Sequence, residues 1–136
     1  MYEHFEHTAD LGLRVTAADL AGLFAEAGRG LTSIIVANLD RVRPVREVRI
    51  AVEGTRLDEL LFDWLNEILY VFESQRLLLA QFDVQIDAAG LRATVRGEEA
   101  DESRHILEHE VKAITYHGLK VEQTDQGYLA EVIVDI

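Results

Sequence analysis

Cysteine is absent from this chain of 136 residues, and proline occurs only once. Without cysteine the chain can form no disulfide framework, no thiol nucleophile and no thiolate site for zinc or an iron–sulfur cluster. Any metal chemistry must therefore use oxygen or imidazole ligands. The sequence also lacks the ~18 consecutive uncharged apolar residues that a membrane-spanning helix requires, and its first residues do not form a signal peptide. We expect a cytoplasmic protein that does not enter a membrane.

Positive charge is scarce as well. Only 13 residues are Lys or Arg, against 25 Asp and Glu, and the formal net charge is −12. A field of that sign repels the phosphate backbone whose neutralisation drives nucleic-acid affinity, so we do not expect strong direct binding to nucleic acid. With 49% hydrophobic residues the chain can bury a core, and its length is typical of one domain. We expect residues 1–136 to form a single domain.

Two long segments have apolar residues at the three- and four-residue spacing of helices. The first follows Asp19, a suitable cap, and extends to Ile35. Three glycines interrupt it, at positions 22, 28 and 30. Since glycine lowers helix stability, we interpret these positions as places where the helix packs closely against a sheet.

The second segment extends from Leu57 to Phe72, and Thr55 with Asp58 resembles a capping box at its start. Its apolar positions cover more than one face, which predicts sheet on more than one side of this helix. We assign Trp64, within it, to the core.

The other segments show the alternation and turn signals of strands, and the tight turns indicate antiparallel pairing. The expected strands are a short segment before residue 8 and the ranges 11–16, 48–52, 77–87, 91–96, 111–116, 119–123 and 128–135. Between them, the acidic run at 97–110 is typical of a solvated loop. The sequence predicts an α+β fold with two long helices packed on mostly antiparallel or mixed sheet.

An acidic pair lies at the two ends of the chain. Asp10 precedes the 11–16 strand, and Asp135 ends the last strand, followed only by Ile136. If the end strands are neighbours, two carboxylates and a backbone or terminal oxygen meet, and these hard ligands suit Ca²⁺ or Mg²⁺. The alternative is a turn residue at Asp10 and a frayed terminus at Asp135. Composition and spacing by themselves favour this alternative, because Asp is common in turns.

The segment His105 to His109 matches the H-x-x-E-H pattern of inverted zinc proteases. On a helix it would present two imidazoles on one face, with Glu108 as the general base. The segment is acidic, however, and no third ligand follows at a suitable spacing, so we expect His105 and His109 to face solvent. An independent metallohydrolase that uses these three residues stays open as an alternative function.

Two basic features stand out against the acidic background. Lys112 and Lys120 are the only lysines, and Lys112 is either a functional charge or a strand-edge lysine that deters aggregation. Four arginines cluster between the first helix and the 48–52 strand, at positions 41, 43, 46 and 49. They are interpreted most simply as solvated, but they leave a small RNA-binding module as a second alternative.

Four blocks of the sequence, taken together and in order, resemble the archease family. The blocks are FEHTADLGL at residues 5–13, WLNEILY at 64–70, VKAITYH at 111–117 and AEVIVDI at 130–136. They span essentially the whole chain. The resemblance implies a single archease-like domain.

Archeases are the small partners of RtcB-type RNA ligases, which join RNA ends in tRNA splicing. The resemblance implies a protein cofactor and not an enzyme: it would promote GTP-dependent guanylylation of the ligase and allow multiple turnover. It also implies that Asp10, Asp135 and Ile136 bind a divalent cation, Ca²⁺ or Mg²⁺, with Ile136 contributing a main-chain or terminal oxygen. Lys112 falls in a functional motif of the family, where it would have a supporting role as a charge.

Overall fold

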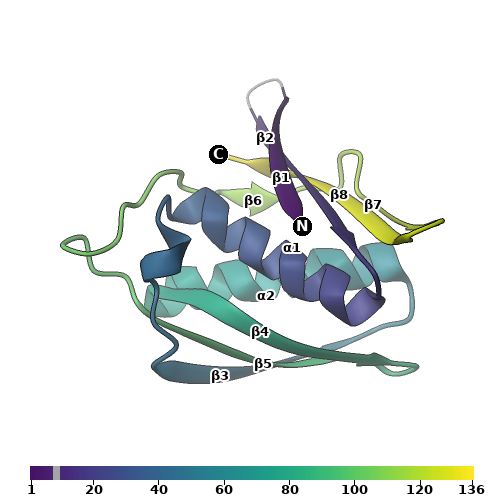
Figure 1. Ribbon diagram of the computed structural model, residues 1–136, viewed down its shortest axis with the longest axis horizontal. Coiled ribbons are helices and arrows are strands. Elements are labelled where there is room, and N and C mark those ends of the chain that lie inside the picture. Colours follow the sequence, from purple (N-terminus) through teal and green to yellow (C-terminus); the bar gives the residue numbers. More distant parts are fainter. Residues whose placement is uncertain (8–9) are drawn as a thin grey trace.

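The computed structural model describes residues 1–7 and 10–136, so Thr8 and Ala9 of the first archease-like block lie outside the described residues. Three layers are seen in Figure 1: a five-stranded sheet, a pair of helices and a three-stranded sheet. In chain order the elements are β1 (Tyr2–His7), β2 (Asp10–Ala17), α1 (Leu20–Ile35), the 3-10 helix η1 (Leu39–Arg41), β3 (Arg46–Glu53), α2 (Leu57–Gln75), β4 (Leu77–Asp87), β5 (Gly90–Glu99), β6 (Ala113–Ile114), β7 (Lys120–Thr124) and β8 (Gly127–Asp135).

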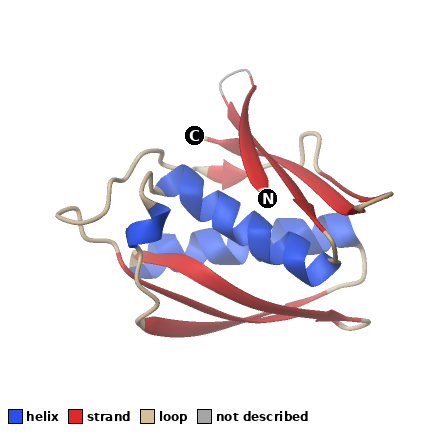
Figure 2. Cartoon of the chain, viewed as in Figure 1, coloured by secondary structure: helices blue, strands red, loops and turns tan. Residues whose placement is uncertain are grey.

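All strand pairs between these elements are antiparallel. The five-stranded sheet has the order β1-β2-β8-β6, with β7 also paired to β8, and the three-stranded sheet has the order β3-β5-β4. The α+β fold predicted from the sequence is confirmed, and the strands divide into two sheets that enclose the helices (Figure 2). Because β2 and β8 are neighbours, the two ends of the chain meet in one sheet.

α1 begins at its predicted cap, and two of its three glycines lie where a sheet packs closely on the helix, whereas Gly22 lies against the Asp19 side chain. The Asp19 side chain caps the helix by accepting a hydrogen bond of 2.7 Å from a backbone N–H of the first turn. A Cβ added at Gly28 would lie 2.7 Å from the Phe82 ring, and one added at Gly30 would lie 2.7 Å from Leu13. Both distances are too short for real Cβ contacts. α1 therefore packs closely against both sheets: at Gly28 against β4 of the three-stranded sheet, and at Gly30 against β2 of the five-stranded sheet.

α2 is covered by both sheets, as the width of its apolar surface predicts. The Trp64 side chain is fully buried, and its Nε1 donates a hydrogen bond of 2.8 Å to the Phe24 carbonyl. The predicted capping box is wrong: the N-cap is Arg56, with no side-chain cap, so Thr55 lies one residue too early to bind the first turn. Neither α2 nor another helix in the described part of the chain is long and apolar enough to cross a membrane.

The segment at 97–110 differs from the solvated loop that its charge predicts. β5 continues to Glu99, and the Glu98 side chain is buried, with the residue only 7% exposed. Its Oε1 accepts hydrogen bonds from the Arg43 backbone N–H (3.1 Å), from Arg104 (2.8 Å) and from His105 Nε2 (2.8 Å). Burial opposes ionisation, but these donors outweigh it and hold the pKa of Glu98 below its ordinary value.

The strand predicted at 111–116 is shorter than expected. Only Ala113 and Ile114 pair with β8 as β6, and the flanking residues join the sheet through single backbone hydrogen bonds. The Lys112 N–H donates to the Asp135 carbonyl at 2.7 Å, and the Thr115 N–H donates to the Ile133 carbonyl at 3.0 Å. β6 therefore lies beside the end of β8, next to the end of the chain.

Candidate functional site

The register of β2 on β8 places Asp10 directly opposite Asp135. Side chains that are paired across two strands point to the same face of the sheet, and their Cβ atoms lie about 4.5–5.5 Å apart. The next pair along the strands is Leu11 with Val134, and Val134 is fully buried towards the helices. Since side chains alternate along a strand, Asp10 and Asp135 point away from the helices, on the outer face of the sheet.

Four strands contribute to this end of the sheet. The last residue of β1, His7, pairs with Asp10, and Ala113 of β6 pairs with Asp135 on the other side. The Lys112 N–H donates a hydrogen bond of 2.7 Å to the Asp135 carbonyl. In Figure 1 the C-terminus lies at this end, beside β6 and beneath the β1–β2 hairpin. Asp10, Asp135 and Lys112, which lie far apart in the sequence, are therefore brought to one end of the molecule.

Asp10 and Asp135 carry like charges, in contrast to the other charged pair between β2 and β8. Further along the same two strands, Arg14 faces Glu131, and their side chains form an ion pair of 2.7 Å. Opposite charges across a strand pair stabilise a sheet, whereas like charges destabilise it. A cation between the two Asp carboxylates would remove that repulsion.

The donor atoms at this end fit a hard divalent cation. Asp10 and Asp135 offer two carboxylates, and Ile136 follows Asp135 with a main-chain oxygen. The Ile136 side chain packs against the core, which holds the end of the chain against the sheet. The described residues contain no group of three or more His, Cys, Asp or Glu arranged to hold a metal ion. Water or a partner would therefore complete the six to eight ligands of Ca²⁺.

The two lysines have different surroundings. Lys120 Nζ lies 3.1 Å from Glu131 and 3.7 Å from Glu122, and the hydrogen bond to Glu131 raises the pKa of Lys120. Lys112 is exposed, and its side chain forms no ion pair with the described residues. The ammonium group of Lys112 is thus the one that a partner can bind without disrupting a contact within the described chain.

The H-x-x-E-H pattern does not form a metal site. His105 is only 2% exposed, so the expectation that it faces solvent is wrong. Its Nδ1 accepts a hydrogen bond of 3.0 Å from the Asp101 N–H, which leaves Nε2 as the donor to Glu98. The segment is irregular, not helical, so His105, Glu108 and His109 do not share a helical face. His105 is a structural residue, and the metallohydrolase interpretation fails.

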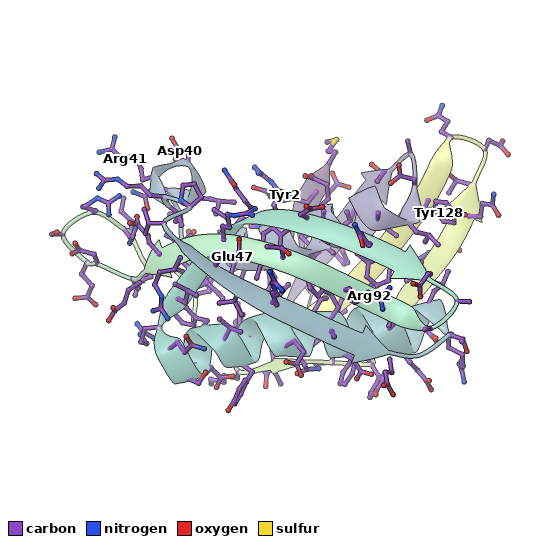
Figure 3. All side chains as sticks on the ribbon, turned by 90° about the horizontal axis from the view of Figure 1, so that it is seen from below. Tyr2, Asp40, Arg41, Glu47, Arg92 and Tyr128 are labelled. Carbon is purple, nitrogen blue, oxygen red and sulfur yellow. The ribbon has the colours of Figure 1, made fainter. Side chains whose placement is uncertain are left out.

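Arg41, Arg46 and Arg49 of the arginine cluster do not share one surface. Arg41 lies on η1 at one end of the molecule, apart from Arg92 and Glu47 on the outer face of the three-stranded sheet (Figure 3). Arg46 reaches Gln75, at the end of α2, with a hydrogen bond of 3.1 Å. Arg49 points to the opposite face of β3 because alternate residues of a strand point in opposite directions. The arrangement does not create a concentrated basic patch.

The structural role of Glu98 is missed by sequence reasoning. Its acidic neighbours suggest solvent, but Arg104 and His105 of the same segment fold back over it, and the Arg43 N–H reaches it from a distant segment. The exposed aromatic rings of Tyr70 and Tyr116 are missed as well. For Tyr70 a signal exists: it is spaced three and seven residues from Glu67 and Asp63, on an acidic face of the helix.

Comparison with known proteins agrees with the resemblance seen in the sequence. The model of the archease protein family matches residues 2–136. The chain is 42% identical over 139 residues to protein archease of Methanopyrus kandleri, and the match covers 99% of each chain. It is 36% identical over 140 residues to protein archease of Pyrococcus furiosus, with 99% of this chain and 98% of the relative covered.

Solved structures match the whole fold. The solution structure of Methanobacterium thermoautotrophicum protein 1598 superposes with a TM-score of 0.86 at 32% identity, covering 99% of this chain and 98% of that one. A crystal structure from Thermotoga maritima, described as an archease and possible chaperone, gives a TM-score of 0.68 at 21% identity, covering 100% and 98%. At that identity the second likeness supports the fold alone.

Proposed function

Because the chain belongs to the archease family, we propose that it is a protein cofactor that activates an RtcB-type RNA ligase in tRNA splicing. In this role it promotes GTP-dependent guanylylation of the ligase and allows each ligase molecule to turn over many times, without catalysing a reaction alone. The observation that carries the proposal is the strand register that sets Asp10 opposite Asp135 on the outer face of the sheet.

The acidic pair is suited to bringing a charge to a partner. Asp10 and Asp135 would bind and orient a divalent cation, Ca²⁺ or Mg²⁺, and the packed Ile136 side chain would keep a main-chain or terminal oxygen of Ile136 near them. When bound, such an ion supplies the charge neutralisation on which phosphoryl transfer largely depends. Lys112, whose backbone holds Asp135, would offer its ammonium group to the partner from the neighbouring strand.

The overall charge of the chain supports a protein partner of this kind. A ligase that binds RNA presents a basic surface, and the net charge of −12 complements it. Charge complementarity speeds the encounter of two proteins and disfavours wrong partners. We place both proteins in the cytoplasm, and we expect this chain to bind the ligase and not the RNA.

The test is the initial rate of covalent guanylyl-ligase formation with GTP and trace amounts of this protein. We expect wild type to accelerate the reaction and to convert ligation from about one turnover to many. Asp10→Ala and Asp135→Ala should lose the effect and keep their fold. Asp125→Ala, a change in the exposed β7–β8 turn, is the matched control and should behave as wild type.

Two outcomes would contradict the proposal. If wild type does not accelerate guanylylation of its cognate ligase, the function is wrong. If both Asp variants accelerate it as well as wild type does, the acidic pair is not the active feature. An electrophoretic shift of RNA by this protein alone, with the steep salt dependence of phosphate contacts, would favour the RNA-binding module instead.

A further inference from the structure

One side of α2 faces solvent, although α1 and the two sheets cover its other sides. At the centre of this open side Tyr70 is 65% exposed. Asn66 and Ser74 lie one turn before and after it, and both side chains bond to carbonyls of α2 itself. Large aromatic side chains are enriched at interfaces because they bury much area at low entropic cost. Tyr70 is therefore a candidate anchor for a partner.

A second exposed ring lies at the border of this face. Tyr116 is 64% exposed and stacks on Phe62 of α2, with ring centroids 3.9 Å apart and an interplanar angle of 13°. Phe62 supports the Tyr116 ring from below, so the ring has a defined position although most of it faces solvent. Tyr70 and Tyr116 belong to different segments, and we call the surface that they form with the open side of α2 the α2 face.

The α2 face is acidic as well as aromatic. Asp63, Glu67 and Glu73 are exposed on the open side of the helix, at spacings of three and seven residues from Tyr70. None of these three carboxylates forms an ion pair with a residue that the structure describes. Glu59, by contrast, lies 3.6 Å from Arg56. The α2 face therefore combines exposed rings with carboxylates whose charge no described cation offsets.

The α2 face lies near the end of the sheet that carries Asp10 and Asp135. The chain segment that follows β5 lies along α2: residues 107–110 border the same hollow as Phe72, and residues 119–121 border one with Arg56. Lys112 and β6 lie between these two ends of the segment, and β6 pairs with Asp135. A partner that covers the α2 face would thus be held next to the end of the sheet that carries Asp10 and Asp135.

We propose that the α2 face docks on a basic surface of a partner protein. Uncompensated carboxylates repel nucleic acid, and two copies of this chain joined by the same face would bring like charges together. A basic protein surface satisfies both the carboxylates and the rings, since Arg pairs with carboxylates and stacks on aromatic faces. This inference rests on the proposed function, under which the partner is the RNA ligase and docking aligns the acidic pair with its active site.

Docking and activation are separated by measuring affinity and maximal rate independently. The affinity of the cognate ligase is measured by calorimetry for wild type, Tyr70→Ala, Tyr116→Ala and the double variant, and guanylylation is measured at saturating concentrations of each. We expect the double variant to bind at least tenfold more weakly and to reach the wild-type rate at saturation. Asp10→Ala should show the reverse: near wild-type affinity and a lost rate.

The controls use other exposed residues and salt. Ile106→Ala removes a side chain that is 62% exposed near the end of α1, where the Ile106 N–H bonds to Asn38, and it should bind as wild type does. Changing Asp63, Glu67 and Glu73 together to their amides should weaken binding at low salt and flatten its salt dependence. Thermal melting of every variant tests that the fold is retained.

The results distinguish the two proposals. If wild type activates the ligase and the double Tyr variant binds as tightly as wild type, the α2 face is not the docking surface, and the proposed function stands. If wild type neither binds nor activates the ligase, both proposals fail. Concentration-dependent dimerisation of wild type that Tyr70→Ala abolishes would assign the α2 face to a second copy of the chain and would overturn the docking inference.

Discussion

Asp10 and Asp135 face each other across two antiparallel strands, so that residues from the two ends of the chain form one pair of like charges. Elsewhere on the same strands a charged pair is complementary, as in Arg14 with Glu131. A like-charged pair costs stability in the free protein, and the cost falls when a cation binds between the carboxylates. Cation binding at the pair should therefore stabilise the folded protein.

Asp10→Ala and Asp135→Ala should each weaken Ca²⁺ or Mg²⁺ binding by about tenfold or more, a loss of at least ~1.4 kcal/mol. Calorimetric titration of the ions into wild type and both variants measures this. In the absence of divalent ions, Asp135→Asn should raise the free energy of unfolding by about 0.2–1 kcal/mol, because it removes the repulsion. Undiminished binding in both Ala variants would mean that the two residues do not share a cation.

An extension beyond Ile136 should reduce activation of the ligase. The Ile136 side chain packs against the core, and the carboxylate that follows it becomes an uncharged peptide group when residues are added. Guanylylation should fall several-fold with a short C-terminal tag and be restored when the tag is cleaved after Ile136. The same tag at the N-terminus is the control. Equal activity of tagged and untagged protein would show that a free carboxylate at Ile136 is not needed for activation.

Lys112→Ala should reduce activation of the ligase, whereas Lys120→Ala should not. Lys112 has no ion pair with the described residues, so its loss should leave the melting temperature unchanged and reduce activation. Lys120 pairs with Glu131 and Glu122 at the surface, so its loss should change the free energy of unfolding by less than about 1 kcal/mol and leave activation intact. Equal effects on activation, or marked destabilisation by Lys112→Ala, would assign Lys112 a structural role.

His105→Ala should destabilise the fold, and His109→Ala should not. The His105 ring is buried and bonds to Glu98 and the Asp101 N–H, so its removal takes one donor from the buried Glu98 carboxylate and leaves a gap in the packing, at a cost of about 1–3 kcal/mol. His109 is partly exposed, and its change should stay within about 0.5 kcal/mol. Chemical denaturation of both variants measures the difference. Similar stabilities of the two would contradict the structural role of His105.

Glu98→Gln should flatten the acid side of the stability profile. The pKa of Glu98 is lower in the folded protein than the ordinary value of 4.5, because its hydrogen-bond donors outweigh burial. The folded state thus binds this proton less readily than the unfolded state does, so the stabilisation is present above pH 4.5 and is lost as the pH falls below it. The difference in unfolding free energy between wild type and variant should shrink from pH 6 to about pH 3. A constant difference would show that the Glu98 charge is not stabilised.

Much of the secondary structure is predictable because its signals are local. Asp19 caps α1, and an apolar run at 77–80 followed by alternation to residue 87 marks the full length of β4, since a cap and a strand pattern act within a few residues of each other. Local signals also mislead. Thr55 has the right partner for a capping box, but the helix begins one residue too late for it.

By itself, the sequence determined the element types, the need for oxygen or imidazole ligands, the acidic surface and, through four blocks in order, the family. Only the tertiary structure decided which side chains meet. The pairing of Asp10 with Asp135, the hydrogen bond from the Arg43 N–H to buried Glu98 and the stacking of Tyr116 on Phe62 join segments far apart in the chain. No local preference encodes such contacts, because they depend on which strands become neighbours once the sheets close over the helices.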